Sequence, residues 1–76
     1  MRPSDYHVLP NERLGGWDVK RENATRASRH FETQNEAIAS ARKLSRGAGT
    51  ELFIHGLDGK ILRKDSHGHD PFPPKG

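Results

Sequence analysis

The sequence predicts an α+β domain in which a single helix packs on one face of a small, mostly antiparallel sheet, in the order β-β-β-α-β-β. One central segment has the apolar period of a helix, whereas the segments on either side alternate at period two. Apolar residues make up only 30% of the 76 residues, so we expect a thin core. A single domain is expected over residues 1–76, with an ordered core at about 5–65 and a proline-rich tail at 66–76.

Three short segments before the helix are predicted to be strands. The first, Tyr6–Pro10, ends at a proline that cannot continue the pairing. The second, Trp17–Arg21, alternates apolar and charged residues, which places Trp17 and Val19 in the core. The third, Arg26–Phe31, is polar and is anchored by its final aromatic residue. These segments form the first part of the sheet.

The helix is predicted over residues 34–45. Thr33 and Glu36 form a capping box, in which the threonine side chain accepts a hydrogen bond from the Glu36 backbone N–H. Gly47 and Gly49 provide the C-terminal stop. One helical face carries the apolar side chains that we expect to meet the sheet, namely Ala37, Ile38, Ala41 and Leu44.

A hairpin follows the helix, with strands at 51–57 and 60–64. Asp58-Gly59 is the dipeptide that a two-residue type I′ turn prefers, because both central residues need positive φ. This turn predicts that His55 lies opposite Leu62. The helix side of the hairpin is then expected to carry Leu52, Ile54 and Ile61, and the outer side Phe53, His55, Leu57 and Leu62.

The composition favours a cytoplasmic protein that does not enter a membrane. The chain has no cysteine, no apolar run of the roughly 18 residues that a span requires, and no apolar segment near its first residues. Thirteen Lys and Arg residues oppose ten Asp and Glu residues, which gives a net charge of +3. This modest basic bias is compatible with a polyanionic partner and equally with plain solubility.

We expect neither catalysis nor a bound metal or other cofactor. Ser66 and His67 are adjacent in the sequence, which does not produce the geometry of a catalytic triad. His67, His69 and Asp70 lie in a glycine-containing terminal segment without the scaffold that a zinc site requires. The sequence also lacks a phosphate-binding loop and a dinucleotide fingerprint. The chain is therefore interpreted as a binding or accessory module.

Several short motifs together carry a family resemblance. They are Tyr6-His7-Val8, Gly16-Trp17-Asp18-Val19-Lys20, Thr33-Gln34 with Glu36-Ala37 and Ala41, Glu51-Leu52 with Ile54-His55-Gly56, Asp58-Gly59 with Ile61, and Asp65-Ser66 with Gly68 and the ending Asp70 to Gly76. The combination spans nearly the whole chain and resembles the bacterial and phage family called domain of unknown function 2188. The resemblance implies a bacterial or phage cytoplasmic protein, and it implies no activity and no functional residues.

Two hypotheses for function remain open. The first is weak binding of DNA or RNA through basic residues, namely Lys20, Arg26, Arg42, Lys43 and Arg46. The second is a protein-interaction module, most simply a homodimer, that uses the apolar outer face of the hairpin at Phe53, His55, Leu57 and Leu62. In a monomer, Phe72 and its flanking prolines are the alternative cover for that face.

Overall fold

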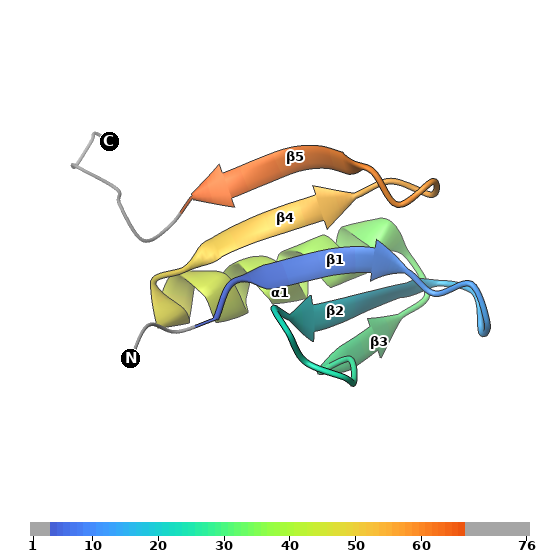
Figure 1. Cartoon of the computed structure of the whole chain (residues 1–76), viewed down its shortest axis with the longest axis horizontal. Coiled ribbons are helices and arrows are strands. Elements are labelled where there is room, and N and C mark those ends of the chain that lie inside the picture. The colour runs from blue at the N-terminus through green and yellow to red at the C-terminus, as the bar shows by residue number, and fades with distance from the viewer. Residues whose placement is uncertain (1–3, 67–76) are drawn as a thin grey trace.

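The computed structural model describes residues 4–66 and shows two layers, a five-stranded sheet and one helix that lies across one face of it (Figure 1). The predicted α+β class and the order β-β-β-α-β-β are confirmed. The elements are β1 (Tyr6–Pro10), β2 (Trp17–Arg21), β3 (Arg29–Phe31), α1 (Gln34–Ala48), β4 (Glu51–His55) and β5 (Ile61–Ser66).

The strand order across the sheet is β3-β2-β1-β4-β5. The central strand β1 pairs antiparallel with β2 and parallel with β4, because α1 carries the chain back to the end of the sheet at which β1 begins. The other two pairings are antiparallel, so the sheet is mostly antiparallel, as predicted. Strand β3 is shorter than expected, and Arg26 lies in the bend before it.

Helix α1 begins where the capping box predicts and ends three residues later than expected. The Thr33 side chain accepts a hydrogen bond of 3.2 Å from the backbone N–H of Glu36. The helix continues through Gly47 and stops at Gly49, whose φ of 70° is the left-handed conformation of a helix C-cap. The backbone N–H of Thr50 then donates to the carbonyl of Ser45 at 2.9 Å, which satisfies a carbonyl in the last helical turn.

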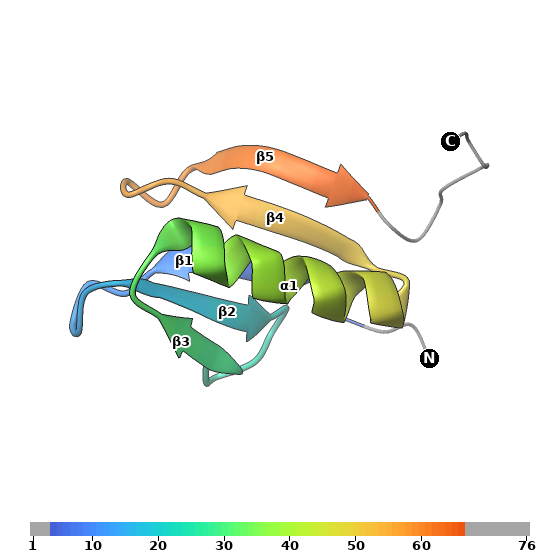
Figure 2. The same cartoon turned by 180° about the vertical axis from the view of Figure 1, so that it is seen from behind.

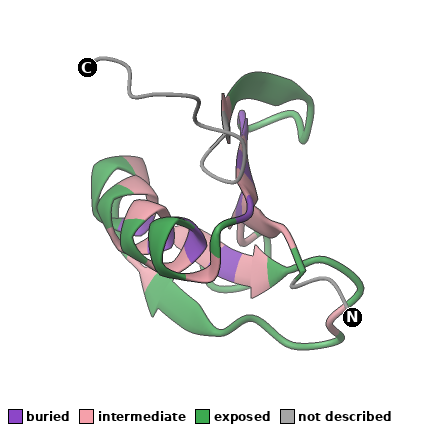
Figure 3. Ribbon diagram, turned by 90° about the vertical axis from the view of Figure 1, so that its left-hand side faces the viewer, coloured by how far each residue is buried: buried purple, intermediate pink, exposed green. Residues whose placement is uncertain are grey.

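The core lies between the helix and the middle of the sheet (Figure 3). Its fully or almost fully buried apolar residues are Val8, Val19, Ala37, Ala41, Leu52 and Ile54. The two alanines allow the helix backbone to approach the sheet closely. Trp17 and Ile38, which were expected in the core, pack against it and remain partly exposed. Seen from the helix side (Figure 2), α1 lies over β1, with β4 on one side of it and β2 and β3 on the other, and β5 lies beyond β4.

The hairpin between β4 and β5 corrects one prediction. The turn is not a two-residue type I′ turn, because Asp58 does not have positive φ and only Gly59 does, at 86°. The backbone N–H of Gly59 donates to the carbonyl of Gly56, and the N–H of Gly56 donates to the carbonyl of Lys60. The loop therefore has three residues and places glycine at its left-handed position, a common alternative for hairpins.

This turn changes the register near the tip of the hairpin. His55 pairs with Ile61 rather than with Leu62, whereas Phe53 pairs with Lys64 as predicted. The change of register between Ile54 and His55 is a β-bulge, which bends the strand and moves side chains to the opposite face. Ile61 is therefore opposite His55, in the place that was predicted for Leu62.

Candidate functional site

The five basic residues predicted to bind nucleic acid do not form one surface. Lys20 lies on the open face of the sheet, and Arg26 follows in the loop between β2 and β3. Both line a shallow depression that also contains Glu12 and Asp18, so anionic and cationic side chains are mixed there. The remaining three residues lie on α1, which covers the other face of the sheet.

Arg42 is already engaged within the fold. Its Nε donates to Oδ2 of Asp65 at 2.8 Å, and both side chains are partly shielded from solvent, with exposed fractions of 39% and 23%. This ion pair connects α1 to β5, the strand that the helix does not cover. Arg42 therefore has a structural partner and is removed from the set of candidate ligand-binding residues.

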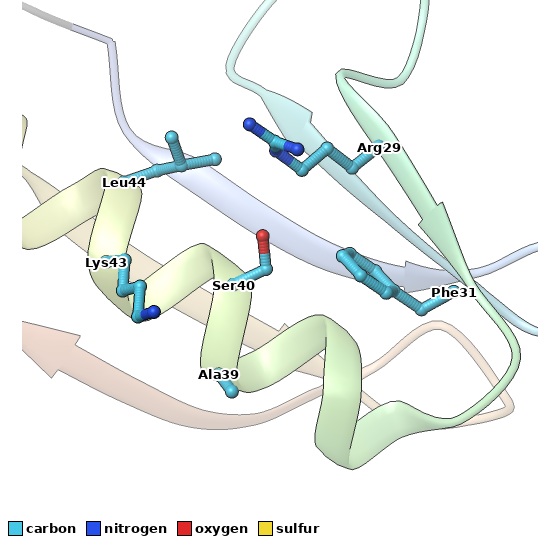
Figure 4. Close-up of a pocket in the computed structure, with 6 residues that line it drawn as sticks. All are labelled: Arg29, Phe31, Ala39, Ser40, Lys43 and Leu44. Carbon is cyan, nitrogen blue, oxygen red and sulfur yellow. The ribbon is translucent and has the colours of Figure 1, made fainter.

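Lys43 borders a groove between α1 and the edge strand β3 (Figure 4). The groove has a volume of about 420 Å³, within the range of small-ligand sites. Arg29 and Phe31 extend from β3 toward the helix, and the hydroxyl of Ser40 points into the space between the two elements. In the part of the chain that the structure describes, the lining residues include no carboxylate; they are Arg29, Phe31, Ala39, Ser40, Lys43 and Leu44.

Two cations of this groove are available to a ligand. Within residues 4–66, neither Arg29 nor Lys43 forms an ion pair, and both side chains are exposed. Phe31 is half-buried, so part of its ring contacts the core while the rest remains accessible. Arg46 lies on the same helix, three residues after Lys43, and is also exposed. The groove therefore combines positive charge, an aromatic ring and a hydroxyl.

Arg29 was missed as a candidate from the sequence. The available signal was the period-two alternation of a strand, which places Arg29 on the same face as Phe31, two residues later. Because Phe31 was expected to anchor this strand to the core, that alternation also directs Arg29 toward the helix layer. Only the packing of α1 against β3 shows that Arg29 and Lys43 line the same groove.

The four residues predicted to form one apolar outer face are divided by the hairpin. Phe53 lies on the open sheet face, where its ring stacks on His7 with centroids 5.1 Å apart, and Lys64 Nζ lies 5.8 Å from its centroid. His55 is buried on the same face. Leu57 belongs to the turn, and Leu62 lines a depression beside Trp17. A single face composed of Phe53, His55, Leu57 and Leu62 is therefore wrong, because the bulge redirects Leu62.

Several other expectations concern the ends of the chain. His67, His69, Asp70 and Phe72 lie outside the described residues, as does most of the proline-rich tail. Among residues 4–66, no group of three or more His, Cys, Asp or Glu side chains is placed to hold a metal ion. In this same part of the chain, no helix is both long and apolar enough to cross a membrane.

Comparison with known proteins places the chain in a family. Residues 6–67 match the family described as uncharacterized protein conserved in bacteria (DUF2188). The uncharacterized protein YdaT of Bacillus subtilis (strain 168) is 40% identical over 58 residues, which are 76% of this chain and 37% of the relative. The chain thus aligns with little more than a third of that longer protein, and no solved structure is a significant match. On this basis, the chain belongs to the DUF2188 family of uncharacterized bacterial proteins.

Proposed function

We propose that this chain is a small, non-catalytic binding module of the bacterial cytoplasm that holds single-stranded nucleic acid in the groove between α1 and β3. The observation that carries the proposal is the composition of this groove. Within residues 4–66, Arg29 and Lys43 supply two cations without an ion pair, Phe31 supplies an aromatic surface, and no carboxylate lines the space. Proteins that bind single strands combine a positive groove with aromatic side chains on which bases stack.

The shape of the site favours a single strand over a duplex. A groove of about 420 Å³ between a helix and a sheet edge admits one base and its phosphate, whereas a duplex needs a broad convex or ribbon-like reader. The broad surface of this protein is the open sheet face, where Asp18, Glu22 and Glu51 mix negative charge with the positive charge of Lys20 and Lys64. The five predicted cations therefore reduce to Lys43 and Arg46, to which we add Arg29.

A matched pair of charge reversals tests the proposal. We would measure the anisotropy of a labelled oligothymidylate of about 12 nucleotides, a length typical of single-strand sites. Arg29→Glu/Lys43→Glu removes the groove cations, and Lys20→Glu/Arg26→Glu makes the same change in net charge on the other side of the sheet. We expect the groove variant to lose about tenfold or more in affinity and the control to lose about threefold or less.

The salt dependence gives a second criterion. With two or three phosphate contacts, the affinity should fall about five- to tenfold between about 50 and 150 mM salt. Phe31→Leu keeps an apolar side chain against the core and removes the stacking surface. It should therefore lower the affinity for the oligonucleotide without changing how that affinity depends on salt, because no charge is altered. Equal losses in the two double variants, or no binding by the wild type at about 50 mM salt, would refute the proposal.

Self-association is a second candidate function, and one observation favours it. Three of the large apolar side chains that the fold leaves exposed lie on the β4–β5 hairpin, namely Leu57 at 79%, Ile61 at 55% and Leu62 at 62%. A second copy of the chain that packed on this hairpin would remove them from water. Sedimentation equilibrium of the wild type and of Leu62→Glu tests this candidate. A wild type that stays monomeric at high concentration would eliminate it.

A further inference from the structure

A chain of hydrogen bonds crosses the open face of the sheet, on the side opposite the groove. The carboxylate of Glu22, directly after β2, contacts Nε2 of His7 on β1. Nδ1 of His7 lies 2.9 Å from Nε2 of His55 on β4. Nδ1 of His55 lies 2.8 Å from the carbonyl oxygen of Gly59 in the hairpin turn. We call Glu22, His7, His55 and the Gly59 carbonyl the histidine chain.

Counting the protons in these three hydrogen bonds leads to a requirement. The Gly59 carbonyl can only accept, so Nδ1 of His55 must carry a proton. One proton is also needed between His55 and His7, and another between His7 and Glu22. Two neutral imidazoles carry two protons in total, and an ionised carboxylate carries none. Three hydrogen bonds therefore need one proton more than the neutral side chains possess.

We propose that the folded protein takes up this third proton and that the histidine chain is a pH-sensitive lock on the open sheet face. With the proton present, the chain ties the end of β2, the central strand β1, strand β4 and the hairpin turn together. Without it, two acceptors face each other at one of the three links, and that link opens. Glu22 is the group that leaves, because its side chain is 46% exposed, whereas His55 is buried.

The other histidine–carboxylate pair on this face has no such requirement. Nδ1 of His30 donates to Asp18 at 2.7 Å, and this single bond is satisfied by a neutral imidazole. His7 differs because both of its ring nitrogens form hydrogen bonds. Nε2 contacts the Glu22 carboxylate, which can only accept when it is ionised, and Nδ1 contacts Nε2 of His55. The need for an extra proton therefore arises from the connection of two imidazoles in series between two acceptors.

Charged groups from each neighbouring element act on the histidine chain. Lys20 on β2 is the register partner of His7, and Lys64 on β5 lies over the Phe53 ring on which His7 stacks. Both cations oppose uptake of the third proton, whereas Glu22 favours it. Glu51 on β4 binds Lys64 at 3.2 Å and so offsets part of that charge. From the helix layer, the amide of Gln34 donates to the backbone carbonyl of His55 at 3.2 Å.

The lock predicts how the stability of the protein depends on pH. If the folded state binds one proton more than the unfolded state, stability falls as the pH rises. The fall in stability begins above the pH range in which an ordinary histidine titrates. Below that range the unfolded chain also holds the proton, so the two states bind the same number. Through that window, the unfolding equilibrium constant should rise by up to about tenfold per pH unit.

Glu22→Gln is the decisive variant. The glutamine amide can donate to a neutral His7, so all three hydrogen bonds form without an extra proton. Urea unfolding between about pH 6 and pH 9, followed by the fluorescence of Trp17, should show a steep pH dependence for the wild type and a shallow one for Glu22→Gln. Asp18→Asn makes the same chemical change beside His30 and should retain most of the wild-type dependence. Parallel curves for wild type and Glu22→Gln would overturn the proposal.

A second measurement does not depend on any variant. Long-range ¹H–¹⁵N spectra of the wild-type imidazoles report which nitrogens carry protons. We expect His55 to be protonated on Nδ1, and His7 and His55 to share a third proton at a pH where an imidazole in an unfolded peptide is neutral. Two rings that titrate independently, or a His55 that carries its proton on Nε2 alone, would refute the lock even if Glu22→Gln failed to fold.

Discussion

Replacing Gly16 with alanine tests the close approach of the β1–β2 loop to β3. Gly15 and Gly16 both have positive φ, 80° and 77°, so alanine at either position pays a similar conformational cost of about 1–2 kcal/mol. At Gly16 a Cβ would also overlap the carbonyl oxygen of Phe31 and lie 3.1 Å from the His30 ring. At Gly15 a Cβ would meet nothing within 4 Å.

The two variants should therefore differ by the steric contribution alone. The Phe31 carbonyl belongs to the backbone just before the helix and cannot rotate away, so we expect Gly16→Ala to cost about 1–3 kcal/mol more than Gly15→Ala. Urea unfolding followed by far-UV circular dichroism measures both free energies of unfolding. Equal values for the two variants would show that the loop does not pack against the end of β3 as described.

Four further substitutions test the helix, the core and the ion pair. Thr33→Ala should lower the free energy of unfolding by about 1 kcal/mol, and an unchanged value would contradict its role as N-cap. Leu52→Ala should lower the free energy of unfolding by about 2–5 kcal/mol because the Leu52 side chain is fully buried. Ile38→Ala should lower it by less because Ile38 is partly exposed. If chemical denaturation showed the larger loss for Ile38→Ala, the assignment of these core residues would be wrong. Asp65→Asn should cost about 1 kcal/mol or less, with a loss that shrinks in high salt, because its ion pair with Arg42 is partly solvated; a larger, salt-independent loss would contradict that reading.

The cation-lined groove and the histidine chain lie on opposite sides of the sheet. The groove is formed by α1 and β3, and the histidine chain crosses β1 and β4 on the face that the helix leaves open. Their tests are therefore separable: the binding assay changes Arg29 and Lys43, and the pH experiment changes Glu22. If the groove does not bind nucleic acid, the pH dependence of stability is still tested by its own experiment, and the reverse also holds.

Much of the fold follows from local sequence signals. Thr33 marks the start of the helix through a bond between residues close in sequence, so it can be recognised without the rest of the molecule. The last turn was not predicted in the same way, because Gly47 and Gly49 both fit a C-terminal stop and the helix continues through Gly47. The alternation of Trp17 and Val19 likewise assigns one face of β2 to the core. Helix and strand periods are properties of the backbone itself, which is why the order of elements was predictable.

The hairpin shows where local signals are insufficient. Asp58-Gly59 fits both a two-residue and a three-residue turn, and the two differ by one residue in register. Successive side chains on a strand point to opposite faces, so a register shift of one residue exchanges the sides predicted for Ile61 and Leu62. Ile61 takes the place opposite His55 that was predicted for Leu62. The choice depends on how β4 and β5 pair along their whole length, which no short segment encodes.

The sequence by itself determined the α+β class, the single helix with its N-cap and the alternating strands, because these depend on interactions within a few residues. Only the tertiary structure decided which charged groups meet. Arg42 and Lys43 are adjacent in sequence, but Arg42 binds Asp65 on β5, whereas Lys43 lines the groove that Arg29 also lines. His7 and His55 are 48 residues apart and come into contact because β1 and β4 pair in parallel. Such contacts depend on the packing of whole elements, and residue spacing alone carries no record of them.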